Sequence, residues 1–148
     1  MERQERMRLN ETVDRLIDFY QHLDASKLES LGDIYHDNIV FQDPAQRIAG
    51  LPALKAYFAG LMENVADCRF VILRSEVATT IGVIEWQMHF SHPRLHSGKP
   101  ISMEGVSLLS GDDKIRHHRD HFDLGAMIYE HVPVVGGVIR HLKRRLQS

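Results

Sequence analysis

The sequence has a single cysteine, and it lacks both a long hydrophobic run and an excess of positive charge. Cys68 alone cannot form an internal disulfide or a thiolate metal cluster. Without a run of about 18 apolar residues, we expect no membrane-spanning segment. The 18 Lys and Arg residues stand against 20 Asp and Glu residues, so the net charge of −2 disfavours nucleic acid as a partner.

The N-terminus, MERQERMRLNE, is charged where a signal peptide would be apolar, so we expect a cytoplasmic protein. The length of 148 residues, with 43% hydrophobic and 26% charged residues, predicts one compact domain over residues 1–148. Gly136-Gly137 lies outside the context of a phosphate-binding loop, and we expect no cofactor.

Apolar residues at helical spacing predict three helices in the first half of the chain. One apolar stripe predicts a helix over residues 5–23. The capping-box pattern Ser26-Lys-Leu-Glu29 predicts that a second helix starts near residue 27. After a short strand over residues 38–44, Gly50-Leu-Pro52 opens a third helix with proline in its first turn.

The hydrophobic period then changes from helical spacing to alternation, which predicts four long strands joined by short turns: 68–78, 82–91, 100–110 and 114–123. Such short connections favour antiparallel neighbours. Helices followed by a meander of strands indicate an α+β fold, with the helices packed on one face of a curved antiparallel sheet.

Two stretches resemble a known superfamily. NIVFQDP followed by AGLPALKAYF resembles the ketosteroid isomerases. EGVSLL, a Gly-Asp-Asp turn and RDHFDL resemble the last strands of SnoaL-like polyketide cyclases and limonene-epoxide hydrolases. All belong to the nuclear transport factor 2-like (cystatin-like) superfamily. The resemblance implies a cone-shaped curved antiparallel sheet with N-terminal helices on its concave face, a deep pocket, and a homodimer formed through the sheet.

The resemblance places a catalytic base at Asp43, where the isomerases carry theirs. A carboxylate beside an apolar pocket can take a proton from a carbon next to a carbonyl. The alternative reading is a plain turn, because Asp before Pro is common at strand ends. The isomerase oxyanion hole consists of a tyrosine and an aspartic acid that its apolar surroundings keep protonated. Neither residue is present at the matching positions of this sequence. These positions are Phe19, with Tyr20 beside it, and Gly105, so a steroid isomerase of the usual type is not expected.

The epoxide hydrolases supply a second comparison. Their acid lies in a last-strand motif whose first aspartate matches Asp120. Their remaining polar partners, an arginine and an aspartate, match Trp86 and Met88, so that triad is also incomplete.

The segment HHRDHFDL, residues 117–124, is the densest polar run on a predicted strand. Alternate residues face opposite ways, and the resemblance turns the set with Asp120 and Phe122 toward the pocket. His117 and His121 would lie about 13 Å apart along the strand, too far to share one metal ion, so no metal site is expected. His118 and Asp120 are near enough to form a catalytic pair or a structural hydrogen bond.

Together these features predict a SnoaL-like isomerase or cyclase that moves protons on a small apolar carbonyl compound. Asp43 and Asp120 are the candidate base and acid, in either assignment, and His118 tunes them. The expected substrate-binding residues shape the pocket: Phe19, Tyr20, Tyr57, Trp86, Met88, Met103 and Phe122. A non-catalytic binding or assembly module of the same fold is the alternative, and an epoxide-hydrolase-like enzyme is a further one.

The tail VPVVGGVIRHLKRRLQS predicts a basic amphipathic helix at about residues 134–146. Such a helix could contact an anionic membrane surface. More often it packs its apolar stripe against its own domain or a partner subunit, and packing is the expectation here.

Overall fold

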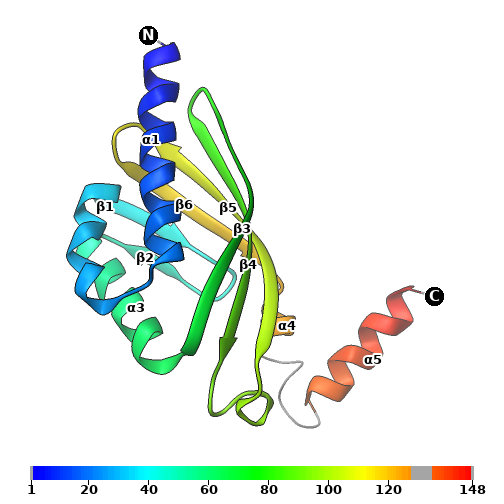
Figure 1. Ribbon diagram of the computed structural model, residues 1–148. Helices are drawn as coiled ribbons and strands as arrows, with labels where there is room; N and C mark the ends of the chain where they lie inside the picture. The colour runs from blue at the N-terminus through cyan, green and yellow to red at the C-terminus, as the bar shows by residue number, and fades with distance from the viewer. Residues whose placement is uncertain (1, 128–134, 148) are drawn as a thin grey trace.

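The computed structural model describes residues 2–127 and 135–147 of the chain. Figure 1 shows the N-terminal helices on one side of a twisted sheet and the C-terminal helix beyond its other side. The helices are α1 (Glu2–Gln21), the 3-10 helix η1 (Ala25–Ser30), α2 (Leu31–Ile34), α3 (Leu51–Asn64), the 3-10 turn η2 (His96–Gly98), α4 (Leu124–Met127) and α5 (Val135–Gln147). The strands are β1 (Tyr35–Gln42), β2 (Arg47–Ala49), β3 (Ala66–Ala78), β4 (Ile81–Ser91), β5 (Ile101–Gly111) and β6 (Ile115–Phe122).

The predicted helices and long strands are confirmed, with ends that differ by a few residues. The prediction that Ser26 caps the second helix is wrong. Asp24 is the capping residue, and its carboxylate accepts a hydrogen bond from the Ser26 backbone N–H at 2.9 Å. Asp24 is extended and can reach the first exposed amide, so the segment begins as a 3-10 helix rather than as one longer α-helix.

Six strands form one sheet in the order β2-β1-β6-β5-β4-β3. The meander β3 to β6 is antiparallel, as predicted. The expectation of a purely antiparallel sheet is wrong for one pair, because β1 lies parallel to β6, with Phe41 opposite His118. The sheet also gains β2, which pairs with β1 and is too short to show a period in the sequence.

The core lies between the sheet and the helices α1, α2 and α3. On β4 the alternate residues Ile84, Trp86, Met88 and Phe90 are buried, while their neighbours are partly exposed. On β6 the residues His118, Asp120 and Phe122 share the inner face, as predicted, and His118 is 1% exposed. Arg116, expected in the same set, is exposed because the pairing with β5 shifts at Gly111.

Candidate active site

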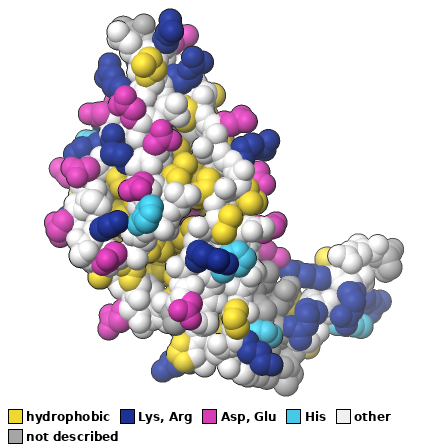
Figure 2. All heavy atoms as spheres, viewed as in Figure 1, with side chains coloured by type: hydrophobic (Ala, Val, Ile, Leu, Met, Phe, Trp, Pro, Cys, Tyr) yellow, Lys and Arg dark blue, Asp and Glu magenta, His cyan; other side chains and the backbone are white. Residues whose placement is uncertain are grey.

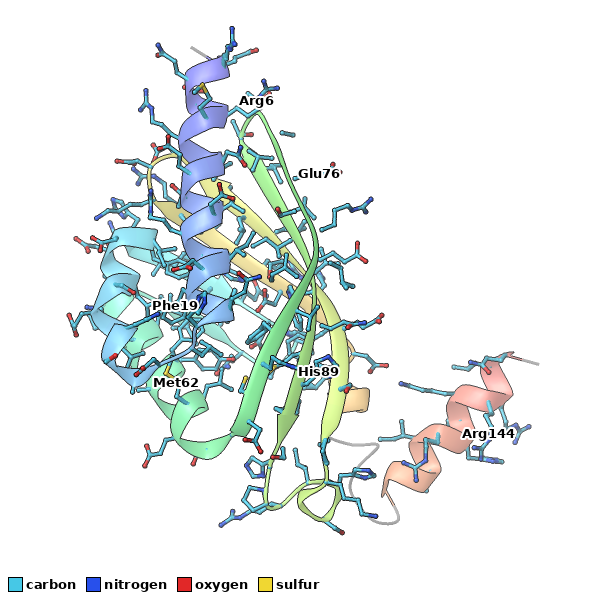
Figure 3. The ribbon with its side chains drawn as sticks, in the orientation of Figure 1. Arg6, Phe19, Met62, Glu76, His89 and Arg144 are labelled. Carbon is cyan, nitrogen blue, oxygen red and sulfur yellow. The ribbon has the colours of Figure 1, made fainter. Side chains whose placement is uncertain are left out.

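A small cavity lies inside the core, between the α1 and α3 helices and the inner face of the sheet. Its volume is about 40 Å³, and eleven residues line it: Tyr20, Phe41, Tyr57, Phe58, Leu61, Phe70, Trp86, Met88, Met103, Asp120 and Phe122. Figure 3 shows the side chains that fill the space between these helices and the sheet, near the labelled Phe19 and Met62. Among the described residues that line it, Asp120 is the only acidic one, and the others are aromatic or apolar.

The size of the cavity limits what it holds in this conformation. A cavity needs roughly 10–15 Å³ to contain one water molecule, so this one has room for a few waters or a ligand of few atoms. A larger ligand requires the aromatic side chains of the wall to move.

Asp120 and His118 form the polar centre of the site. The His118 Nε2 atom lies 2.6 Å from Oδ1 of Asp120. Both residues come from the inner face of β6, two positions apart, so the strand itself sets their spacing. His118 is buried behind the cavity wall, whereas Asp120 reaches the cavity.

The same carboxylate oxygen meets a second donor from the neighbouring strand. The hydroxyl of Ser107 on β5 donates to Asp120 Oδ1 at 2.5 Å, and Ser107 is directly opposite Asp120 in the ladder. The indole N–H of Trp86 donates in turn to the Ser107 hydroxyl at 2.9 Å. Two donors therefore hold Oδ1 in place.

The other ring nitrogen of His118 continues the chain of contacts to β1. His118 Nδ1 lies 2.8 Å from the hydroxyl of Tyr35, which is fully buried. One assignment satisfies all these groups: Tyr35 donates to Nδ1, and the Nε2–H donates to an ionised Asp120. Burial, followed by the charge of Asp120, raises the pKa of Tyr35 well above its ordinary value, so its hydroxyl keeps its proton.

Two more tyrosines, Tyr20 and Tyr57, line the cavity and keep their phenolic protons. Burial, then the neighbouring Tyr35, raises the pKa of Tyr20 far above the usual range. The pKa of Tyr57 is also raised, first by burial and then by the charges of Asp43 and Asp120. A neutral phenol in an apolar wall can donate to an oxygen of a bound molecule, because no water competes for that hydrogen bond.

Asp43 lies outside the cavity and has structural partners. Its Oδ1 accepts hydrogen bonds from the backbone N–H groups of Ala45 and Gln46, at 2.8 and 3.0 Å. The side-chain amide of Gln46 donates to its Oδ2 at 3.3 Å. This is the turn geometry typical of an aspartate at a strand end, and it shapes the connection from β1 to β2.

The predicted site residues therefore separate into two groups. Tyr20, Tyr57, Trp86, Met88, Met103 and Phe122 line the cavity together with Asp120, and His118 supports it from behind. Phe19 does not line the cavity. It packs against Phe58 at 5.4 Å between ring centroids and also borders a hollow on the outer side of α1.

Sequence reasoning missed Ser107 and Tyr35 as members of the site. A signal for Ser107 was present, since it is a polar residue among the buried alternate positions of β5. Nothing in the sequence pairs Tyr35 with His118, because that contact depends on the parallel pairing of β1 with β6. Among the described residues, no group of three or more His, Cys, Asp and Glu side chains is placed to hold a metal ion.

The family model of the SnoaL-like domain matches residues 16–118, which is most of the chain. The chain belongs to the SnoaL-like family. The match runs from Leu16 in α1 to His118 in β6, so it includes most of the cavity wall but neither Asp120 nor Phe122. Among curated proteins, none matches this sequence.

Solved structures of SnoaL-like and related proteins share the fold. A protein assigned as a SnoaL-like polyketide cyclase from Jannaschia sp. CCS1 superposes with a TM-score of 0.72 at 18% identity, covering 83% of this chain and 90% of that one. An LEH-like epoxide hydrolase from M. tuberculosis gives 0.66 at 17% identity, covering 83% and 88%. A protein with a ketosteroid isomerase-like fold from Catenulispora acidiphila gives 0.68 at 14% identity, covering 82% and 91%. At these identities the likeness establishes the fold alone.

Proposed function

We propose that this SnoaL-like protein is a cofactor-independent enzyme that moves a proton on a small, mostly apolar carbonyl compound. One observation carries the proposal: Asp120 lines an aromatic cavity while His118 and Ser107 hold one of its two oxygens. A carboxylate placed in this way is oriented before a substrate arrives, and the apolar wall keeps water from competing with it.

In the proposed reaction, Oδ2 of Asp120 takes a proton from the carbon next to the substrate carbonyl. The electrons of the broken C–H bond move into the carbonyl group and form an enolate. The Tyr57 hydroxyl, which keeps its proton, donates a hydrogen bond to the enolate oxygen. Asp120 then returns the proton to another carbon, which isomerises the substrate. In the alternative outcome the enolate carbon attacks a second carbonyl carbon, and the alkoxide that forms takes the proton from Asp120, which cyclises the substrate and restores the carboxylate.

In this proposal the base is Asp120 rather than Asp43. Both carboxylate oxygens of Asp43 accept hydrogen bonds within the turn after β1, and Asp43 is not among the residues that line the cavity. Asp120 is therefore the carboxylate in position to meet a substrate, with His118 as its positioning partner.

The test measures hydrogen–deuterium exchange in a ketone, at the carbon next to its carbonyl. The exchange takes place in heavy water and is monitored by proton NMR. A panel of small cyclic and aromatic ketones serves as the probe, so the natural substrate need not be known. The wild-type protein should accelerate exchange for at least one ketone, and Asp120→Asn should lower that rate by about 100-fold or more. Asp37→Asn, the same change at an exposed aspartate, is the matched control. Equal rates for the wild type and Asp120→Asn would exclude the catalytic role of Asp120.

A non-catalytic binding or assembly module is the second candidate, and the apolar residues at two positions of the cavity wall favour it. Trp86 and Met88 occupy positions that are polar in the epoxide hydrolases. If no ketone exchanges while native mass spectrometry detects a bound small molecule, the binding module is correct. Hydrolysis of an epoxide has less support, because Asp120 lacks the arginine and aspartate partners of that reaction.

We also propose a cytoplasmic location and a homodimer formed through the outer face of the sheet. The exposed apolar residues on that face support the dimer. The lone, largely buried Cys68 suits a reducing compartment.

A further inference from the structure

The C-terminal helix α5 differs in composition from the rest of the chain. Its 13 residues, VGGVIRHLKRRLQ, contain four Arg and Lys residues and no Asp or Glu. The whole chain has a formal net charge of −2, so the remainder carries −6 and opposes the +4 of α5. Figure 2 shows this separation as dark blue side chains gathered on α5, beside a body in which both signs are mixed.

The apolar residues of α5 lie at helical spacing and are exposed. Val138, Leu142 and Leu146 recur every four residues, so they share one side of the helix. These residues are 55%, 55% and 88% exposed, so more than half of each lies open to solvent in the described structure. Leucine and valine exposed together on one helix face, bordered by cations, indicate a surface that has a partner.

The helix is held to the body at its polar side. Lys143 Nζ lies 2.6 Å from Oδ2 of Asp123, the residue that follows β6. Figure 1 shows α5 projecting away from the helical layer and the sheet, with the C-terminus at its far end. Figure 3 marks Arg144 on this projecting helix, remote from the cavity residues. The arrangement leaves the Leu142 side of α5 accessible.

We propose that α5 binds the surface of a bilayer that contains anionic lipids. Its apolar stripe would enter the boundary between headgroups and acyl chains, and its Arg and Lys side chains would meet lipid phosphates. None of the helices in the described residues is long and apolar enough to cross a bilayer, so α5 lies along the surface. This inference does not depend on the proposed enzyme activity.

The charge of α5 favours a membrane over a second copy of the chain as the occupant. Two α5 helices packed along their stripes would bring eight cationic side chains together, and like charges at that distance repel. A protein partner would need an apolar groove bordered by several carboxylates. An anionic bilayer supplies both the apolar layer and the negative charge on one continuous surface.

The test is vesicle flotation of the full chain with phosphatidylcholine vesicles that contain, or lack, about one third phosphatidylglycerol. The wild-type chain should float with the anionic vesicles and remain unbound with the neutral ones, and added salt should weaken binding. Arg144→Gln with Arg145→Gln should lower vesicle partitioning by roughly 10-fold or more, since each cation near the surface contributes. Leu142→Gln with Leu146→Gln should lower it by a similar factor without changing the charge.

A matched control distinguishes binding through α5 from general electrostatic attraction between the protein and the vesicles. Arg3→Gln with Arg6→Gln removes the same charge from α1 and should leave flotation within about twofold of the wild type. Fluorescence of Trp86, the only tryptophan, reports whether each variant keeps its core. Absence of flotation by the wild type, or equal losses in the α1 and α5 double variants, would overturn the proposal. So would unchanged flotation of the Leu142→Gln and Leu146→Gln variant together with the loss of a dimer, since the stripe would then bind a second copy of the chain rather than the bilayer.

Discussion

The indole ring of Trp86 lies directly over the backbone of Gly105, in the space that a side chain at position 105 would occupy. The two residues are opposite each other in the β4–β5 ladder. Because Gly105 has no side chain, the ring can lie across the strand and its N–H can reach Ser107. The glycine therefore takes part in the orientation of Asp120 through Trp86 and Ser107, although it touches neither the carboxylate nor the cavity.

Gly105→Ala should be destabilising, because the new Cβ overlaps the atoms of the Trp86 ring. We expect the free energy of unfolding to fall by about 1–3 kcal/mol, which is the usual cost of overpacking a core. Urea denaturation monitored by Trp86 fluorescence measures this change in the free energy of unfolding. Gly60→Ala on α3 is the control, since a Cβ there meets nothing within 4 Å. An equal free energy for both alanine variants would contradict the role of Gly105.

Asp43→Ala should lower the stability of the fold rather than remove a cavity group. The change deletes the acceptor of three hydrogen bonds, from the Ala45 N–H, the Gln46 N–H and the Gln46 side-chain amide. We expect a loss of about 1–2 kcal/mol in the free energy of unfolding. Asp43→Asn keeps one acceptor oxygen and should lose less. Unchanged urea midpoints for both variants would show that the turn does not need this side chain.

The protein should lose stability at alkaline pH in two steps. Burial raises the pKa of the Cys68 thiol from 9.0 to about 11, while the unfolded chain keeps the ordinary value. A raised pKa contributes stability that is complete below pH 9 and is lost as pH rises toward 11. The raised pKa values of Tyr20, Tyr35 and Tyr57 add a further loss above pH 10, their ordinary value.

Urea titrations across this pH range measure both steps. Cys68→Ala should remove the first step and leave the second, which starts when unfolded tyrosines ionise. Tyrosinate absorbance should rise together with unfolding rather than before it, for the three buried tyrosines. The chain has four tyrosines, so ionisation of more than one of them near pH 10 in the folded protein would contradict the proposed burial.

The outer face of the sheet should form a dimer with a second copy of the chain. Ile81 and Leu108 lie on this face and are 49% and 40% exposed. They border a hollow that His117 and Arg119 of β6 also line. Leu108→Asp would place two carboxylates near the two-fold axis and should convert a dimer into a monomer in native mass spectrometry. Met7→Gln, at an exposed residue of α1, is the control, and a wild-type monomer would disprove the dimer.

Local patterns in the sequence were enough to predict the helices and the long strands. The alternation on β4 follows from the side-chain period of a strand and placed Trp86 on the inner side. On β6 the alternation only separated two sets of residues, and the family resemblance was needed to turn the set with His118 and Asp120 inward. The position of Phe19 was less predictable. The residues Phe19 and Tyr20 are both buried on α1, and only the packing against α3 decides which one reaches the cavity.

The rest of the site depends on contacts between distant segments. Ser107 meets Asp120 because the β5–β6 register sets them opposite each other, and a shift of one residue would have turned Ser107 away. Tyr35 reaches His118 across the parallel pairing of β1 with β6. Hydrophobic periodicity within one segment contains no information on either register. The contacts of Ser107 with Asp120 and of Tyr35 with His118 could therefore not be predicted.

The parallel pairing of β1 with β6 also governs when the protein can fold during synthesis. Tyr35 and His118 are 83 positions apart, so β1 leaves the ribosome long before its neighbouring strand exists. Until then the apolar faces of α1 and β1 have no sheet to cover them, and closing so long a loop slows the final step. Newly made chains should therefore depend on chaperones until β6 has emerged, and a ribosome stalled before residue 115 should carry an incompletely folded chain.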